Sequence, residues 1–429
     1  MPNKFYKFAA HGSLVLSFLS LPSLAHAVDL SFSGFGTLGY AYENQDELAF
    51  RRDITRTTDI DTDGSFRVDS NIGMQFDAAF NRDWSFTTQF LFDQGVTYDL
   101  DELTELAFIR YSPNASWDFR AGRVGVSAYV AADSRHIDYA HLWVRPPQEL
   151  YGGIVFNSLD GIGATYYSNN AYFNWKASLE YGRNQEVGEV PLSNEEYSTD
   201  LDNVVSLSFE VDKNEWKWQL SYARVGSLTV NQTGQTELLQ NSVDQFANNP
   251  GVAAFFPAIS AEALRTRDAL VVENEQIHYF QAAALYFDGL WTFQTELFNI
   301  DAVQDSIPQG YGGYALVGRT FDSLTPYAIY GRFKPSSSPF QQDEDWSQAG
   351  AQAAQLQGAT EAAINSVRID QESYSVGLRW DVSPYIALKA QYDHVKINPY
   401  GYGLWASTLE TMGSSSRVHL FSLNMNFIF

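Results

Sequence analysis

The sequence predicts an all-β protein: a transmembrane antiparallel β-barrel of about sixteen strands with short turns at one end and long loops at the other. Three observations lead to this prediction. Segments of about ten residues alternate apolar and polar side chains. The links between these segments alternate between short and long. After residue 27, no run of about 18 apolar residues could form a spanning helix, so any membrane span must consist of strands.

Composition narrows the class of protein. The chain of 429 residues has no Cys, and its 51 acidic and 27 basic residues give a net charge of −24. Without Cys, disulfides, zinc-thiolate sites and cysteine nucleophiles are excluded. A nucleic-acid partner would require a basic surface, so the acidic balance argues against one. Aromatic residues make up 15% of the chain and charged residues only 18%, a mixture typical of extracytoplasmic β proteins.

Residues 1–27 have the features of a secretory signal peptide. A basic start precedes an apolar stretch at 12–21, and Ala25-His26-Ala27 is a small-x-small cleavage site. The apolar stretch is shorter than the roughly 20 residues of a spanning helix, which argues against a membrane anchor. We therefore expect cleavage after Ala27, export to the cell outer membrane, and a single barrel domain over residues 28–429.

The alternating segments are clearest at the C-terminus. The last segment places one row of apolar side chains opposite a row of polar ones. The apolar row is Phe421, Leu423, Met425, Phe427 and Phe429, and the polar row is Ser422, Asn424 and Asn426. A soluble β-sandwich alternates in the same way, so this pattern alone does not decide between the two folds.

Connection lengths decide between a sandwich and a barrel. Seven very short links centre on Asn81-Arg82-Asp83, Pro113-Asn114-Ala115, Asn169-Asn170, Lys213-Asn214, Asp288-Gly289, Asp322-Ser323 and Ser383-Pro384. Eight long polar links alternate with them, at about 44–64, 94–101, 125–159, 183–200, 227–274, 302–311, 334–368 and 398–415. A barrel with tight periplasmic turns and long extracellular loops predicts this sorting. Fifteen connections imply sixteen strands, and the even number places both termini on the periplasmic side.

Two long links contain helix-like stretches. One link has them at 236–240 and 261–265, and the other at 347–364. We expect short helices folded over the outer mouth, with disorder as the alternative. Tryptophans near strand ends indicate an interfacial girdle. They are Trp84, Trp117, Trp175, Trp216, Trp218, Trp291 and Trp380.

Strand alternation places more charges on the inward face than a dry core could hold, and a water-filled lumen would accommodate them. The predicted inward charges are Arg67, Arg110, Arg120, Lys176, Lys217, Arg332, Arg379 and Lys389 with Asp69, Asp77, Asp93, Glu102, Asp118, Glu180, Glu210, Glu296, Asp381 and Asp393. The third long link adds Asp133, Arg135, Asp138, Arg145 and Glu149, and its Pro146-Pro147 would stiffen it. The alternative is that the charges of this link only hold it to the barrel wall.

Other candidate sites are weak. Asp59, Asp61 and Asp63 match the first half of a calcium loop, but Ser70 stands where the loop needs Glu. We interpret them as a solvated acidic loop, with divalent ions bridging it to lipopolysaccharide as the alternative. His136 and His141 are five residues apart, which is not a recognised metal-ligand spacing. Neither a nucleophile elbow nor a phosphate-binding loop is present, so we expect no enzyme activity, no catalytic residues and no cofactor.

Two segments carry a resemblance to a known family. Residues 119–126, Phe-Arg-Ala-Gly-Arg-Val-Gly-Val, lead on to Trp143-Val144-Arg145-Pro146-Pro147, and residues 372–381 precede Leu388-Lys389. These segments resemble proteobacterial (Gram-negative) outer-membrane porins of the general type. The terminal Phe429 resembles the signal read by the barrel-assembly machinery of that family.

The resemblance implies a sixteen-stranded porin that is usually a homotrimer, with its third loop folded into the pore. It also implies contact with outer-membrane lipid and lipopolysaccharide. One departure is the second link, at 94–101, which is shorter than the loop that latches neighbouring subunits in trimeric porins. The first strand, with Phe32, Gly34, Gly36 and Leu38, is a candidate packing surface because small residues allow close approach.

The predicted function is therefore passive diffusion of small hydrophilic solutes and ions through a charged constriction. The predicted constriction residues are Arg110, Arg120, Arg123, Asp133, Arg135, Asp138, Arg145 and Glu149. The predicted pore-wall residues are Arg332, Arg379 and Lys389. We expect Asp133 and Asp138 to face Arg110 and Arg120 across the narrowest point, and acidic outer loops to give a weak cation preference. A substrate-specific channel or a surface receptor is the alternative.

Overall fold

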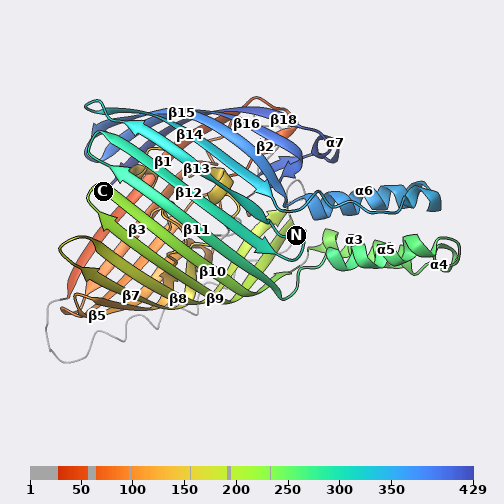
Figure 1. Ribbon diagram of the computed structural model, residues 1–429, viewed down its shortest axis with the longest axis horizontal. Helices are drawn as coiled ribbons and strands as arrows, with labels where there is room; N and C mark the ends of the chain where they lie inside the picture. Colours follow the sequence, from red (N-terminus) through yellow and green to blue (C-terminus); the bar gives the residue numbers. More distant parts are fainter. Residues whose placement is uncertain (1–27, 57–63, 96–97, 155, 191–194, 232) are drawn as a thin grey trace, which may run out of the picture.

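The computed structural model describes residues 28–429 except 57–63, 96–97, 155, 191–194 and 232. Its described residues form a closed antiparallel barrel of sixteen strands, as the sequence predicts (Figure 1). The expected signal peptide and the candidate calcium ligands Asp59, Asp61 and Asp63 lie outside the described residues.

The barrel strands follow one another in chain order, and β1 pairs with β18 to close the ring. Their bounds are β1 Asp29–Glu43, β3 Asn71–Ala79, β4 Trp84–Phe92, β5 Thr104–Asn114, β6 Trp117–Gly125, β7 Ser158–Asn169, β8 Asn174–Val190, β9 Glu195–Lys213, β10 Trp216–Asn231, β11 Glu275–Phe287, β12 Trp291–Ala302, β13 Gly310–Arg319, β14 Leu324–Pro335, β15 Ile369–Ser383, β16 Ile386–Tyr402 and β18 Ser416–Ile428. A small sheet of β2 (Leu48–Phe50) and β17 (Trp405–Ser407) joins the first and last long loops.

All seven predicted short links are turns between neighbouring strands, and they lie at one end of the barrel, here named the short-turn end. Residues with positive φ make these turns tight: Asn214 at 55°, Asp322 at 53° and Gly289 at 91°. Asn, Asp and Gly tolerate this left-handed backbone better than other residues, so the sequence marks the turn positions.

The outer surface of the barrel is apolar, as lipid contact requires. Leu220, Leu423 and Ile162 each expose about three fifths of their surface on outward-facing rows. A tryptophan belt surrounds the short-turn end, where Trp84, Trp117, Trp216 and others lie exposed. Among these rings Trp216 stacks on Trp218 with centroids 5.8 Å apart, and Trp84 stacks on Tyr111 at 4.5 Å. None of the helices among the described residues is long and apolar enough to cross a membrane.

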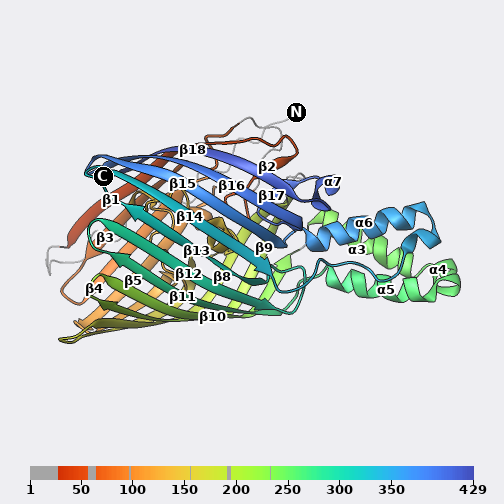
Figure 2. The same ribbon diagram turned by 45° about the horizontal axis from the view of Figure 1, so that its top comes forward.

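Helices occupy the other end, here named the long-loop end. Their bounds are α1 Leu100–Leu103, η1 Asp138–Ala140, α2 Gln148–Tyr151, α3 Gly234–Ala247, α4 Pro250–Phe255, α5 Pro257–Ala269, η2 Trp346–Ala349, α6 Ala351–Asn365 and α7 Leu409–Met412. The predicted helical stretches fall in α3, α5 and α6. These helices project away from the barrel, opposite the C-terminus, instead of folding across its mouth (Figures 1 and 2). They project because they form a core of their own, in which the Trp346 ring stacks on Phe246.

The prediction of a long loop at 183–200 is wrong, because most of this segment is strand. Strands β8 and β9 continue through most of this segment. Their pairing runs from Asn184 opposite Leu201 to Val190 opposite Glu195. The sequence does not show this extension because both faces of the hairpin carry polar residues once it passes beyond the apolar band. The hairpin raises the barrel wall on the side opposite β16 to β1.

Candidate pore constriction

The third loop, residues 126–157 between β6 and β7, folds into the barrel and crosses its lumen, as the resemblance implied (Figure 1). Its segment η1 contacts β1 and β18, and its helix α2 packs against β13, β14 and β15. The loop therefore starts at one wall and is held along the opposite wall. Six anchoring residues explain why it stays there.

Arg145 forms a deeply buried anchor. Its guanidinium binds both carboxylate oxygens of Asp69, with Nε 3.0 Å from Oδ1, and lies 3.4 Å from Asp393. The same group donates to Ser422 and stacks over the Phe50 ring at 4.7 Å. The Arg145 side chain is only 4% exposed and the Asp69 side chain 1%. A bidentate, hydrogen-bonded pair is the form in which buried charges are tolerated.

Two basic residues of the wall hold the backbone of the third loop. The Lys389 Nζ donates to the carbonyls of Asp138 and Trp143, the latter at 2.8 Å. The Arg379 Nη1 donates to the carbonyls of Tyr139 and His141 at 2.7 and 2.8 Å. Both residues point into the barrel, where they donate to loop carbonyls that would otherwise be buried without donors.

Asp138 joins the third loop to the first strand. Its carboxylate accepts from Thr37 at 2.8 Å and from Asn71 at 3.3 Å, and it pairs with Arg52 at 3.4 Å. The expectation that Asp138 faces Arg110 and Arg120 is therefore not met. The loop reaches further across the barrel than the sequence indicated, so Asp138 meets β1 and β3.

Glu296 on β12 accepts four hydrogen bonds and anchors the loop at Val130 and at Tyr151 of α2. Its carboxylate accepts from the Val130 backbone at 3.1 Å, from Gln281 at 2.8 Å, and from the hydroxyls of Tyr151 and Tyr314 at 2.6 and 2.5 Å. The residue is fully buried. Charge-assisted bonds from four neutral donors replace its hydration shell.

Helix α2 also makes a hydrogen bond to the barrel wall, at β15. Gln371 donates to Glu149 at 2.9 Å. A Cβ on Gly331 would lie 2.3 Å from the Glu149 carboxylate, so only Gly leaves room for it. Burial raises the pKa of Glu149 above its usual range.

Arg135 braces the loop internally instead of facing the pore. Its guanidinium donates to the carbonyls of Tyr151 and Ile154, each at 2.9 Å, and to Asn157 at 3.1 Å. His136 lies 3.1 Å from Glu105 on β5 and 2.8 Å from Asn157. These contacts join the two ends of the loop, and no pattern in the sequence indicates the role of Asn157.

The pKa values of Arg145 and His141 in the loop are also shifted. Burial acts to lower the pKa of Arg145, but the attraction of Asp69 and Asp393 outweighs it and the pKa is raised. Burial lowers the pKa of His141 to about 4, so its ring is neutral at pH 7. The neutral ring stacks on Trp143 at 4.6 Å, and its Nε2 lies 3.0 Å from the Ser134 carbonyl.

The third loop leaves one side of the lumen uncovered. On this uncovered wall, formed by β5 to β10, charged side chains remain open to solvent. Arg110 is 42% exposed and pairs with Asp118 at 3.4 Å, while Lys176 and Lys217 are 34% and 39% exposed and share Glu210. By contrast, the Lys389 residue on the covered side is 3% exposed. Arg120 on the uncovered wall pairs with Glu180 at 3.4 Å, and these two side chains are only 12% and 0% exposed.

Most of the sequence-predicted residues have one of two positions. Asp138, Arg145, Glu149, Arg379 and Lys389 anchor the loop, and Arg110 with Arg120 lines the uncovered wall. Asp133 lies beside β6, where its Oδ1 would be 3.2 Å from a Cβ on Gly125.

Arg123 and Arg332 were placed wrongly. Arg123 lies on the outward row of β6 and binds Asp160 and Asp101, with Nε 2.9 Å from the Asp160 Oδ1. Arg332 shares the outward row of β14 with the exposed Tyr330 and pairs with Asp370 at 3.0 Å. The inward row of β14 is apolar here because it packs against the third loop. A prediction that polar side chains face the lumen therefore assigns the wrong row of this strand to the inside.

The uncharged partners of the loop were not singled out by the sequence. Strand alternation places four of these partners on the inward face: Thr37, Asn71, Gln371 and Ser422. This inward position is the feature of the sequence that could have identified them. Within the part of the chain that the structure describes, His, Asp and Glu do not gather into a group of three that could hold a metal ion.

Comparisons with known proteins identify the fold. No protein-family model and no curated protein sequence matches the chain. Among solved structures, OmpF of Salmonella typhi in complex with daunomycin matches with a TM-score of 0.51 and 11% identity, over 93% of this chain and 97% of that one.

Two further structures match over similar lengths. The outer membrane channel DcaP of Acinetobacter baumannii matches with a TM-score of 0.49 and 12% identity, over 94% of this chain and 97% of that one. A mutant of the Rh. blastica porin matches with a TM-score of 0.45 and 11% identity, over 94% and 100%. The closed barrel, its strand order and its inward third loop show that the chain has the sixteen-stranded fold of outer-membrane porins.

Proposed function

We propose that the protein is an outer-membrane channel for passive diffusion of small hydrophilic solutes and ions. The observation that carries this proposal is the uncovered wall, where Arg110, Lys176 and Lys217 keep a third or more of their side-chain surface in water beside a firmly anchored loop. Charges that remain hydrated inside a barrel with an apolar outer surface indicate an aqueous passage. The mechanism needs no bond-making step, no cofactor and no catalytic residue.

The selectivity of this passage tests the proposal. Replacing both Arg110 and Arg120 by Gln should shift the channel toward cations, because Asp118 and Glu180 then lose their basic partners. A unit charge about 7 Å from the path of an ion in water changes its free energy by about 0.6 kcal/mol, or roughly threefold in local concentration. Reversal potentials under a KCl gradient in planar bilayers measure the shift.

The matched control removes the same charge from the outside of the barrel. Arg183 and Arg224 lie on outward rows with Tyr181 and Leu220. Replacing both by Gln should leave the reversal potential unchanged. If wild-type protein gives no ion conductance, the channel proposal is wrong. If both double variants behave alike, the uncovered wall does not line the passage.

The assembly is proposed to be a homotrimer in contact with outer-membrane lipid and lipopolysaccharide, with the mature chain starting at Val28. The first strand remains the candidate packing surface, but its glycines are covered. A Cβ on Gly34 or Gly36 would lie 2.3 or 2.5 Å from the ring of Phe429 or Phe427. The surface is therefore aromatic, with Phe32 51% exposed. Native mass spectrometry giving only monomers would contradict the trimer.

A further inference from the structure

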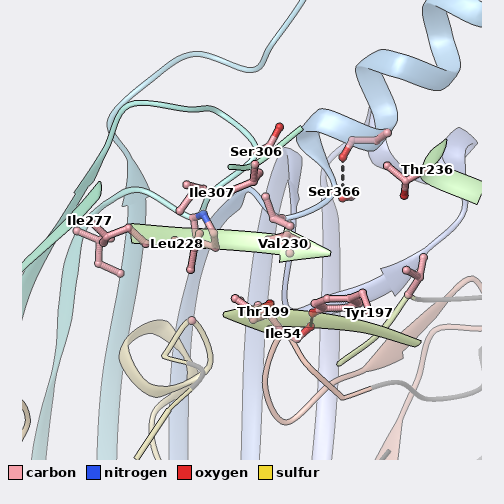
Figure 3. A pocket seen from close by; sticks show the side chains of 18 of the residues that line it. Ile54, Tyr197, Thr199, Leu228, Val230, Thr236, Ile277, Ser306, Ile307 and Ser366 are labelled. Carbon is pink, nitrogen blue, oxygen red and sulfur yellow. Dashed lines mark hydrogen bonds between the residues drawn. The ribbon is translucent and has the colours of Figure 1, made fainter. Parts of the chain in front are cut away.

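A cavity of about 670 Å³ lies in the long-loop half of the barrel, above the third loop (Figure 3). Ala128, Tyr129 and Ile154 of the third loop line it, and so do the barrel-facing ends of α3 and α6. The inward side chains of β9 to β12 form its wall. This outer cavity therefore stands between the long-loop end and the constriction.

The wall of the outer cavity is apolar, unlike the rest of the lumen. Leu201, Val225, Leu228, Ile277 and Ile300 line it, and Figure 3 shows Leu228 and Ile277 among its side chains. Each of these residues is at an inward position where a porin lumen is ordinarily polar. Such a surface in contact with water is unfavourable unless an apolar group covers it.

The change from polar to apolar occurs within single strands, at the level of the third loop. On β10 the inward row reads Gln219 and Ser221 below the loop and Ala223 and Val225 above it. On β11 the same row passes from Gln281 to Tyr279 and Ile277. On β12 it passes from Glu296 to Ile300. Neighbouring strands change together, so the apolar patch is continuous.

A buried polar atom of the cavity lining, the Tyr279 hydroxyl oxygen, has no hydrogen-bond partner among the described residues. The Tyr279 residue is 8% exposed. The neighbouring buried tyrosines are satisfied, since Tyr129 donates to Asn157 and Tyr151 to Glu296. Other hydroxyls of the lining are also satisfied: Ser306 donates to the Ala269 carbonyl at 2.6 Å and Ser366 to that of Ala363 at 2.7 Å. A buried phenol without a partner is costly unless something binds to it.

We infer that the outer cavity is a solute-binding antechamber for small amphipathic molecules, with an apolar body and one hydroxyl or carbonyl group. The apolar body would cover Val225, Leu228 and Ile277, and the polar group would exchange a hydrogen bond with Tyr279. The volume suits such a molecule, because ligand pockets commonly measure about 300–1,000 Å³. This inference rests on the proposed channel function and specifies which solutes the channel retains on the way to its constriction.

Current recording with 2-naphthol tests the inference, since this probe has a flat apolar body and one hydroxyl. Added on the side of the long loops, it should interrupt the single-channel current with a residence time well above that of glucose. Tyr279→Phe removes only the free hydroxyl and should shorten the residence time about fivefold. Leu228→Asn makes the wall polar and should shorten it by a similar or larger factor.

The matched control is Tyr286→Phe, the same change on the same strand. Tyr286 lies on the outward row near the short-turn end, where its hydroxyl binds Asp288, so residence times should match wild type. Residence times equal to that of glucose in wild type, or unchanged in Leu228→Asn, would overturn the antechamber. Loss of binding in Leu228→Asn but not in Tyr279→Phe would refute the role of the hydroxyl.

A second readout separates this inference from the channel proposal. Equilibrium dialysis of 2-naphthol against the barrel in lipid nanodiscs, with Leu228→Asn in identical nanodiscs as the reference for lipid partitioning, measures binding without conductance. A barrel that conducts KCl but binds no more 2-naphthol than Leu228→Asn keeps the channel and refutes the antechamber. A barrel that binds 2-naphthol but conducts no ions refutes the channel and keeps the binding site.

Discussion

Replacing Arg145 by Met is expected to lower the free energy of unfolding by roughly 3–5 kcal/mol and to loosen the third loop. The substitution keeps the size of the side chain but removes the guanidinium that binds Asp69 and Asp393. Both carboxylates then stay buried without a cation, which costs more than the loss of the ion pair itself. Because Arg145 anchors the centre of the loop, single-channel conductance should also rise and become noisier.

Urea unfolding in detergent and bilayer recording measure the two effects of this substitution. Adding Asp69→Asn and Asp393→Asn to Arg145→Met should restore part of the stability, since no buried charge remains, while the conductance stays altered. Arg319→Met is the control, because Arg319 is exposed at the short-turn end and should change stability by about 0.5 kcal/mol or less. An Arg145→Met barrel that unfolds like wild type would show that this pair does not hold the loop.

Deleting Phe429 is expected to reduce the folded fraction of the barrel several-fold while leaving secretion intact. Phe429 lies in the seam that closes the barrel, where its N–H and carbonyl pair with Gly34 at 3.0 and 2.9 Å. Its ring lies 5.8 Å from that of Phe32. Two backbone hydrogen bonds near 1 kcal/mol each are lost with the residue, together with the ring contact. The proposed assembly signal for the barrel-assembly machinery is lost as well.

Two substitutions separate these contributions. Phe429→Ala keeps both backbone bonds but removes the ring, and Phe429→Tyr keeps both features. The folded band on unheated electrophoresis gels, compared with total exported protein, measures the folded fraction. We expect wild-type levels for Phe429→Tyr, intermediate levels for Phe429→Ala and the lowest for the deletion. Normal folding of the truncated chain would exclude a role for the closing seam in assembly.

The sequence by itself determined the number of strands and the short-turn positions, and its resemblance to porins implied the inward loop. Turns are local: Asn214, Asp322 and Gly289 adopt positive φ without help from distant residues. The outward rows are equally local, because lipid selects apolar side chains such as Leu220 and Leu423 at every second position. Helices α3, α5 and α6 were also visible, since their segments have residues of good helix propensity.

Only the tertiary structure decided which charges are open to water and which row of a strand faces inward. Asp138 meets Thr37, 101 residues away in the chain, and Arg145 meets Asp393, 248 residues away. No periodicity encodes such contacts. Arg332 was misplaced because the inward row of β14, with Ile329 and Phe333, is covered by the third loop and is itself apolar.

The same reason hides the outer cavity from the sequence. Where the inward row of a strand becomes apolar and its outward row polar, alternation assigns the inward residues to the lipid-facing side. On β10 and β11, Val225 and Ile277 look like outward residues until the closed barrel fixes their direction. The register of the strands and the path of the third loop, both set by contacts between distant segments, therefore decide where the passage is hydrated and where it is apolar.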